Sequence, residues 1–288
     1  MPAEPPVISP RSLAEAYAAL AAAPHRPLAG GTDLLVQITG ELGEPPERVL
    51  DIWRLDELRG VRLESNALLI GALMTYAEIR SAPLVAELLP ALAQAAATIG
   101  AAQIQNRGTI GGNVANASPA GDTLPILLAC EAELVVGSVR GERRIAARDF
   151  WPAYRRTALA DDELLLRISL PLVPGRQVRY RKVGTRRAQA ISKVVMALAW
   201  RTDGPAAPEA PWRDVRLALG SVAPTTIRAP RTEAVVEGST PNEATADRAA
   251  ASLASEIRPI DDVRSTADYR RAVASRVLHR LVRDEGGW

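Results

Sequence analysis

Cysteine and histidine are nearly absent from this chain of 288 residues, which holds one cysteine and two histidines. An iron–sulfur cluster needs about four thiolate ligands, so this chain is not expected to hold one by itself. We expect no metal site either, because His25 and His279 lie far apart in the sequence and Cys130 is the only thiol. Cys130 has no partner for an internal disulfide, and its place in an apolar run predicts a buried thiol.

An excess of charge of one sign is also missing. The 35 basic residues are balanced by 33 acidic ones and form no basic tract, so we expect no nucleic-acid partner. No apolar run reaches the roughly 18 residues of a membrane-spanning helix. The first residues lack the basic and apolar regions of a secretory leader, which favours a cytoplasmic protein. Aromatic residues make up only 4%, so the core must consist of Ala, Leu, Val and Ile.

Two stretches rich in glycine and other small residues are the most informative features present. They are Leu28–Leu35, read LAGGTDLL, and Thr109–Asp122, read TIGGNVANASPAGD. Small residues let backbone N–H groups approach a ligand closely, as the oxygens of a diphosphate require. Asp33 would repel phosphate and should face elsewhere. Neither stretch matches the Rossmann fingerprint or the P-loop, and the paired glycines of the first also fit an ordinary tight turn.

The second stretch ends in Asp122, a carboxylate suited to a nucleotide. It can accept hydrogen bonds from ribose hydroxyls, as acidic residues do in many nucleotide sites. It could also cap a helix over 123–129, and the two roles are compatible. Two such stretches in one chain predict a dinucleotide held between two lobes.

Helix and strand signals divide the chain into three parts. Residues 1–54 predict a small α/β lobe with a helix over 12–23 and strands near 26–29 and 49–53. Residues 55–174 predict a second lobe with strands near 67–70, 133–138, 143–145 and 164–170, and helices from Thr75, over 83–99 and over 124–129. Beyond a boundary at 174–177, residues 175–288 predict an antiparallel sheet from 178–183, 192–201 and 215–222, a hairpin tip at 204–211, and helices over 240–257 and 266–284.

The two glycine stretches, together with three further segments, resemble the FAD-binding (medium) subunit of molybdenum hydroxylases, the relatives of xanthine dehydrogenase and carbon monoxide dehydrogenase. The further segments are Gly71-Ala72, DELLL at 162–166 and YRKVGTRRAQAISK at 180–193. The resemblance covers nearly the whole chain, including the final helix with Asp268-Tyr-Arg-Arg. It implies an α+β fold of the vanillyl-alcohol-oxidase type. Two α/β lobes hold FAD, and a C-terminal domain of antiparallel sheet and helices packs alongside.

The resemblance also implies the residues that contact FAD. The diphosphate and neighbouring flavin atoms would be held by Leu28, Ala29, Gly30, Gly31, Thr32, Asp33 and Leu34. The cradle would continue through Thr109, Gly112, Asn113, Ala117 and Ser118. Asp122 would bind the adenosine ribose, and the adenine would be flanked by Leu165 and by Ile99, which precedes Gly100.

The resemblance implies that Lys182 approaches the flavin, where a cation stabilises a reduced, anionic ring. Without the resemblance, Lys182 would be interpreted as a solvent-exposed lysine on a strand. Gln189 stands where some relatives have an acidic residue near the nicotinamide side, which leaves NAD+ use open.

The implied function is electron transfer, for which the cofactor carries the chemistry and no catalytic acid or base is needed. Electrons would come from 2Fe–2S clusters on an iron–sulfur subunit, beside a large molybdopterin-binding subunit, and leave to NAD+ or another acceptor. The Gly-Thr-Asp form of the first stretch favours purine oxidation, with nicotinate, quinoline, aldehyde or carbon monoxide oxidation as rivals. The alternatives are a stand-alone flavin- or nucleotide-binding protein without partners, and an α/β protein whose glycine stretches are only turns.

Overall fold

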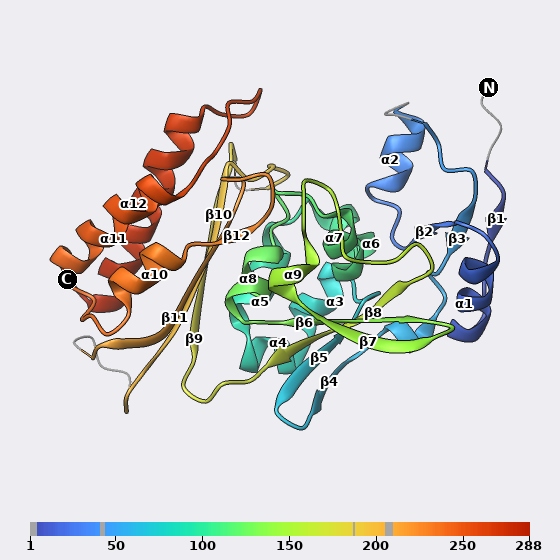
Figure 1. The fold of residues 1–288 in the computed structure, drawn as a ribbon, viewed down its shortest axis with the longest axis horizontal. Coiled ribbons are helices and arrows are strands. Elements are labelled where there is room, and N and C mark those ends of the chain that lie inside the picture. The colour runs from blue at the N-terminus through green and yellow to red at the C-terminus, as the bar shows by residue number, and fades with distance from the viewer. Residues whose placement is uncertain (1–4, 41–43, 187, 205–209) are drawn as a thin grey trace.

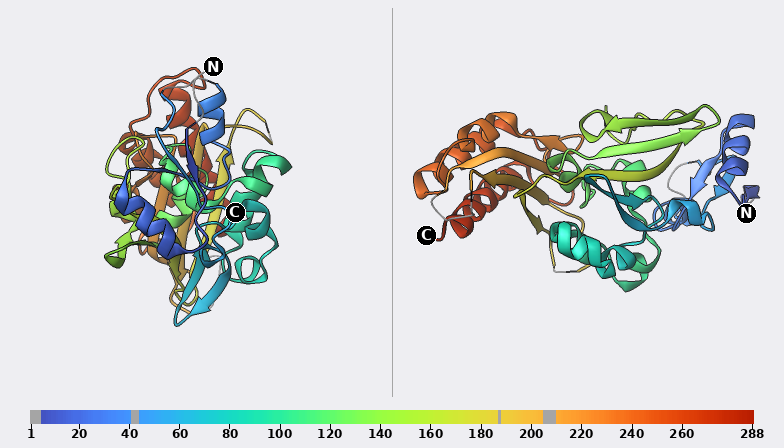
Figure 2. Two further views of the ribbon diagram at one scale, coloured as in Figure 1. Left: turned by 90° about the vertical axis from the view of Figure 1, so that its right-hand side faces the viewer. Right: turned by 90° about the horizontal axis from the view of Figure 1, so that it is seen from below.

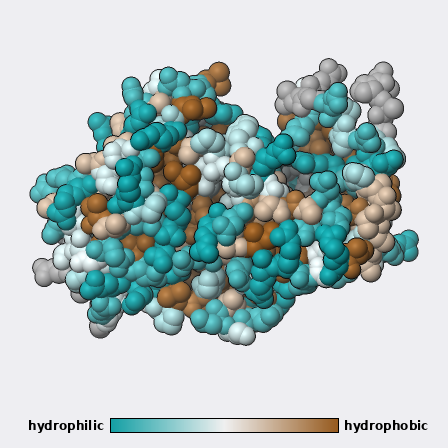
Figure 3. Space-filling view, in the orientation of Figure 1, coloured by the Kyte–Doolittle hydropathy of each residue, from teal (hydrophilic) through white to brown (hydrophobic). Residues whose placement is uncertain are grey.

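Three β-sheets follow one another along the molecule in the computed structural model, which describes residues 5–40, 44–186, 188–204 and 210–288. The N-terminal sheet lies at one end and the C-terminal helices lie at the other (Figures 1 and 2). Residues 1–4, which bear on the expected lack of a secretory leader, and 205–209, most of the predicted hairpin tip, lie outside the described residues. Most of the face shown in Figure 3 is hydrophilic. No helix in the described ranges is long and apolar enough to cross a membrane.

The N-terminal lobe is a small parallel sheet with two helices. Its strand order is β1 (Val7–Ile8), β3 (Val49–Asp51) and β2 (Arg26–Leu28), and its helices are α1 (Leu13–Ala22) and α2 (Leu34–Thr39). Ser12 caps α1 by accepting a hydrogen bond from the N–H of Glu15, as its sequence predicts. The chain leaves β2 directly into the first glycine stretch, so this sheet positions that stretch.

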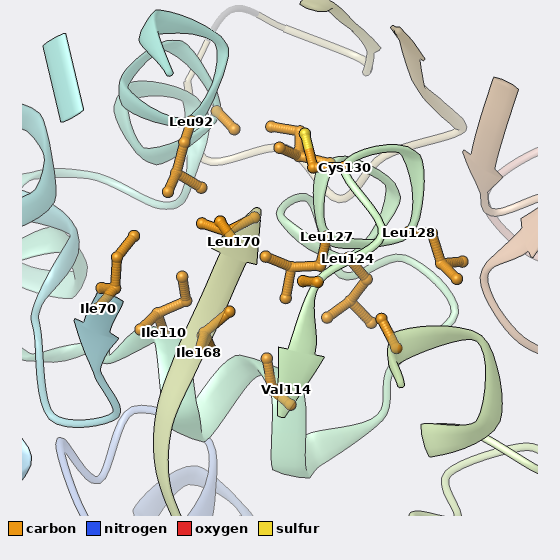
Figure 4. Packing of buried hydrophobic residues seen from close by; sticks show 14 of the residues in the cluster. Ile70, Leu92, Ile110, Val114, Leu124, Leu127, Leu128, Cys130, Ile168 and Leu170 are labelled. Carbon is orange, nitrogen blue, oxygen red and sulfur yellow. The ribbon is translucent and has the colours of Figure 1, made fainter. Parts of the chain in front are cut away.

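The second lobe is built on a five-stranded antiparallel sheet. The strand order is β4 (Val61–Glu64), β5 (Ala67–Gly71), β8 (Leu164–Pro171), β6 (Glu133–Ser138) and β7 (Gly141–Ala146). Its helices are η1 (Asp56–Leu58), α3 (Tyr76–Ser81), α4 (Pro83–Leu88), α5 (Pro90–Thr98), α6 (Ala102–Arg107), α7 (Ile110–Asn116), α8 (Leu124–Ala129) and α9 (Ala147–Phe150). Buried Ile, Leu and Val side chains from the sheet and helices pack together, and the Cys130 thiol is buried among them as predicted (Figure 4).

Two features of this lobe differ from the sequence prediction. The helix predicted over 83–99 is two helices, because Pro90 has no N–H to donate and Leu89 leaves helical geometry with φ −147° and ψ 62°. The second glycine stretch is not entirely a loop, because its first half forms the short helix α7. The capping box predicted at Thr75 and Glu78 is confirmed.

The C-terminal sheet has a central strand, β10, that is buried on both faces over residues 194–200. Its order is β12 (Ile227–Arg228), β11 (Trp212–Gly220), β10 (Val194–Thr202) and β9 (Gln177–Val183), all antiparallel. Its helices are α10 (Pro230–Val236), α11 (Glu243–Glu256) and α12 (Ala267–Gly286). Along β10, Val195 and Ala197 join the core of the second lobe, whereas Met196 and Leu198 pack with the C-terminal helices. This alternation, with a period of two residues, lets one sheet join the second lobe to the helical layer (Figure 1).

Candidate cofactor-binding site

Two adjoining cavities lie between the first glycine stretch and the second. The first has a volume of about 290 Å³ and the second about 320 Å³. The residues that line both are Thr32, Asp33, Tyr76, Asn113 and Asn116. Because they share these walls, the two cavities form a single cleft between the N-terminal lobe and the second lobe.

The first glycine stretch offers free hydrogen-bond donors to this cleft. The backbone N–H groups of Gly30, Gly31, Thr32 and Asp33 have no acceptor among the described residues, and all four residues line the first cavity. Gly31 has φ 77°, a conformation that favours glycine. Successive free N–H groups in a turn suit the oxygens of an anion, so this stretch fits a diphosphate.

Close backbone packing explains why glycine stands at positions 30 and 111, independently of any ligand. A Cβ atom at residue 30 would lie 1.7 Å from the carbonyl oxygen of Arg107, at the end of α6. A Cβ at residue 111 would lie 2.6 Å from the carbonyl oxygen of Ala72. These glycines therefore permit the packing of backbone on backbone, and Gly30 also borders the cleft, as Gly112 does.

The second stretch contributes side chains more than backbone donors. Thr109 caps α7 by accepting from the N–H of Gly112 at 3.1 Å, and the N–H groups of Ile110 and Gly111 donate to backbone carbonyls. The Asn113 side-chain oxygen accepts from the Thr123 hydroxyl at 2.6 Å, which orients its amide group. The donors of the first turn of α7 are thus already used within the protein.

Asn116 joins the two glycine stretches. Its Nδ2 donates to Asp33 Oδ1 at 3.1 Å, and its Oδ1 accepts from Arg155 Nη1 at 3.1 Å. Arg155 has φ 50°, a strained conformation for a residue with a side chain. Asp33 is therefore occupied by an amide donor.

Asp122 and Lys182 form a buried ion pair at the second cavity. Lys182 Nζ donates to Asp122 Oδ2 at 2.6 Å and to the carbonyl oxygen of Thr98 at 2.9 Å. The Ser192 hydroxyl donates to the other oxygen of Asp122. Burial raises the pKa of Asp122, and the bonds from Lys182 and Ser192 oppose that rise.

Asp122 does not cap the following helix. The N-cap of α8 is Thr123, and its side chain makes no capping hydrogen bond. Both oxygens of Asp122 are held by other side chains, so the helix-cap interpretation was wrong. Sequence reasoning treated Asp122 and Lys182 separately and did not foresee their contact.

Most of the predicted contact residues line the cleft. Those in the first cavity are Leu28, Ala29, Gly30, Gly31, Thr32, Asp33, Leu34, Thr109, Gly112 and Asn113, and those in the second include Ile99, Gly100, Ser118 and Asp122. Ala117, Leu165 and Lys182 line neither cavity; the first two are buried, and Lys182 contacts the cleft wall through Asp122. The structure therefore does not bring Ile99 and Leu165 to one cavity, and their role beside the adenine stays a prediction.

Several residues that line the cleft were not singled out from the sequence. Tyr76 is buried between the two cavities, and burial raises the pKa of its hydroxyl far above the ordinary value. The turn at Tyr154 and Arg155 lines the second cavity, and the segment 157–163 contributes to the first. Only the neighbouring capping box at Thr75 could have pointed to Tyr76.

Comparison with known proteins identifies the family of this chain. A family model described as the FAD binding domain in molybdopterin dehydrogenase matches residues 3–173, and one described as the CO dehydrogenase flavoprotein C-terminal domain matches residues 179–284. The chain is 36% identical over 248 residues to the glyceraldehyde dehydrogenase medium chain of Sulfolobus acidocaldarius, covering 86% of both chains. It is 30% identical over 284 residues to a putative xanthine dehydrogenase FAD-binding subunit of Escherichia coli, covering 96% of this chain and 95% of that one.

Solved structures agree with this assignment. The chain matches carbon monoxide dehydrogenase from Hydrogenophaga pseudoflava with a TM-score of 0.90 and 32% identity, covering 97% of this chain and 96% of that one. It matches quinoline 2-oxidoreductase from Pseudomonas putida 86 with a TM-score of 0.91 and 26% identity, covering 99% and 98%. The expected α+β fold is confirmed. The chain belongs to the FAD-binding subunits of the molybdenum hydroxylase family, and FAD is its cofactor.

Proposed function

We propose that this chain holds FAD in the cleft between its first two lobes and serves as the electron-transfer subunit of a molybdenum hydroxylase. The observation that carries the proposal is the row of backbone N–H groups from Gly30 to Asp33, which have no acceptor among the described residues and belong to residues that line a cavity. When bound, FAD supplies a ring that accepts and releases electrons.

The residues of the cleft have distinct roles in this proposal. The N–H groups of Gly30–Asp33 bind the diphosphate, and the hydrogen bond from Asn116 to Asp33 keeps that stretch in place. The side chains of Ile99 and Tyr76 exclude water from the second cavity. Asp122 lines the second cavity and pairs with Lys182 behind it, so the pair sets the local field at the cofactor.

We further propose two partner chains, an iron–sulfur subunit and a large molybdopterin-binding subunit. Several relatives are named medium chains, which supports a multi-subunit complex. Electrons enter from the iron–sulfur subunit and leave to NAD+ or another acceptor. We retain the expectation of a cytoplasmic complex.

The substrate of the complex belongs to the partner chains. The named relatives include dehydrogenases of glyceraldehyde, carbon monoxide, nicotinate and xanthine. Identity to the putative xanthine subunit is 30%, against 36% for the glyceraldehyde chain, so identity gives no support to the purine preference. We propose an aldehyde, an N-heterocycle such as a purine, or carbon monoxide.

Purification of a tagged full-length chain from its own host tests this function. The expected result is co-elution with two further chains and a spectrum that combines flavin and iron–sulfur absorption. Addition of the complex's substrate should then bleach the flavin band before an acceptor restores it. A yellow protein that elutes alone from fresh extract would instead support a stand-alone flavoprotein, and a colourless chain that ignores added FAD would contradict both.

A further inference from the structure

The C-terminal sheet touches the second glycine stretch at Pro119. The N–H of Ser221 donates to the carbonyl oxygen of Pro119 at 2.7 Å. A Cβ at the preceding residue, Gly220, would lie 2.8 Å from the same oxygen. Ser221 itself has φ 66°, a costly conformation that persists only where the surroundings hold it. The end of β11 is therefore held tightly against the wall of the second cavity.

Hydrogen bonds continue from Ser221 to the buried ion pair. The Ser221 hydroxyl donates to the carbonyl oxygen of Ser192 at 2.9 Å. The Ser192 side chain, 1% exposed, donates in turn to Asp122, which lines the cleft and pairs with Lys182. This series is buried along its length, so each bond is stronger than it would be in water.

Arg270 of α12 holds the far end of the same series. Its Nη1 donates to the carbonyl oxygen of Ser221 at 2.9 Å and to that of Lys193 at 3.1 Å. Its Nη2 donates to Asp262 Oδ1 at 2.7 Å, which balances its charge. Arg270 is only 4% exposed. One guanidinium therefore fixes the backbone at Ser221 and at Lys193, the residue directly after Ser192, and so holds both serines of the hydrogen-bond series.

We infer that Arg270 is a positioning residue for the cofactor pocket, acting through Ser221 and Ser192 on Asp122. It anchors two carbonyl groups, which fixes the Ser192 hydroxyl on the carboxylate and so sets the charge that the Asp122–Lys182 pair presents to the cleft. This inference rests on the proposed function, because it concerns the site at which FAD binds. Arg270 itself lines neither of the two cavities that make up the cleft.

A fold-stabilising arginine would behave differently in one measurable respect. A donor that is lost from an ionised carboxyl raises the pKa of that carboxyl, whereas a loss of packing alone does not. The other groups that face Asp122 are Lys182 from β9, Tyr76 from α3 and Tyr180 from β9. Burial keeps both tyrosines protonated, because it raises their pKa values far above the ordinary range. Asp33, Asp161 and Glu163 line the first cavity and also titrate at acidic pH. A change in the acidic part of the profile is therefore assigned to Asp122 where Ser192→Ala, which removes a donor to Asp122 itself, produces the same change.

The experiment measures the FAD dissociation constant and the flavin reduction potential of the full chain as a function of pH. Arg270→Met should weaken the hydrogen bond from Ser192 to Asp122 and so move the acidic bend of both profiles to higher pH by about one unit. A hydrogen bond to a charged group contributes a free energy that corresponds to a pKa shift of about that size. Arg270→Lys keeps a charged donor and should restore most of the wild-type profile. The matched control is Arg271→Met, the next residue of α12, which pairs with Asp268 at the surface.

Ser192→Ala separates the proposed route from other routes. It should move the bend in the same direction, and adding Arg270→Met to it should produce no further movement, because both changes interrupt one series. If Arg270→Met does not fold, Ser192→Ala, Ser221→Ala and Arg270→Lys still test the inference.

Two results would overturn the inference about Arg270. In one, Arg270→Met lowers the melting temperature but leaves both profiles as in Arg271→Met. In the other, the double variant shows the sum of two separate shifts. A wild-type chain that binds no FAD would instead contradict the proposed function.

Discussion

Gly30 and Arg107 are in backbone contact where the N-terminal lobe meets the second lobe. A Cβ atom at residue 30 would lie 1.7 Å from the carbonyl oxygen of Arg107, so only glycine fits there without a shift of the backbone. The contact sets the position of the first glycine stretch and hence of its free N–H groups. It couples the packing of the two lobes to the shape of the cleft.

Gly30→Ala should therefore lose FAD and destabilise the protein. Overpacking of this kind costs about 1–3 kcal/mol, and the displaced stretch no longer presents its donors together. Gly71→Ala is the matched control, because its added Cβ would lie 2.4 Å from the carbonyl oxygen of Leu58 and residue 71 lines neither cavity, so it should destabilise the protein but keep FAD. Flavin absorbance per chain and the melting temperature measure both effects. Equal FAD content in the two variants would contradict this role of Gly30.

The hydrogen bond between Asn116 and Asp33 gives a second prediction. Asn116→Ala removes one bond between the glycine stretches and should weaken FAD binding by up to about tenfold, since such a bond contributes about 1 kcal/mol. Asn116→Asp should weaken it more, because two carboxylates then face each other beside a diphosphate. Titration of the full chain with FAD, followed by flavin fluorescence, measures the affinities. An Asn116→Asp variant that binds as well as wild type would rule out a linking role.

The periodic segments of the fold were predictable from the sequence because their signals are local. The caps at Ser12 and Thr75 and the strand alternation along β10 depend on residues a few positions apart. The break at Pro90 was also readable in principle, since proline cannot donate within a helix. Apolar periodicity on both sides of that proline concealed it.

The site was predictable in its residues but not in its contacts. The glycine stretches indicated a diphosphate cleft, yet the reason for Gly30 is a carbonyl 77 positions later, at Arg107. The pairing of Asp122 with Lys182 joins residues 60 positions apart, one in the turn before α8 and the other in β9. Such contacts depend on how the lobes pack, and a single sequence carries no local pattern for them.

Removal of Lys182 should expose the cost of burying Asp122. In Lys182→Met an unpaired carboxylate stays in the interior, which destabilises the folded state by about 3–5 kcal/mol at neutral pH. The pKa of Asp122, already raised by burial, rises further. Because the folded state then binds a proton more tightly than the unfolded state, the penalty is absent below the ordinary value of 3.8 and grows as the pH rises through the folded-state pKa.

Urea unfolding of Lys182→Met at pH 5 and pH 8 measures this effect. The loss of unfolding free energy should be smaller at pH 5. Adding Asp122→Asn removes the charge and should recover part of the loss at pH 8. A loss that is the same at both pH values would mean that Asp122 is not the source.

The ion pair of Glu163 with Arg143 should stabilise the folded protein at neutral pH and lose this effect on acidification. Arg143 donates to both of its oxygens, at 2.7 and 2.6 Å, and this lowers the pKa of the Glu163 carboxyl. A lowered folded-state pKa contributes stability above the ordinary value of 4.5, and that contribution disappears as the pH falls through the folded-state pKa. Glu163→Gln should lower the melting temperature near pH 7 and approach wild type near pH 3. Parallel curves over that range would show that the ion pair contributes nothing.

The position of FAD in crystals of the full chain grown with excess cofactor tests the central claim most directly. The account predicts diphosphate density against the N–H groups of Gly30–Asp33, with the remainder of the cofactor in the cleft bordered by Asn113 and Asp122. Density for FAD elsewhere on the chain, or a cleft filled by rearranged side chains in crystals that contain FAD, would contradict it.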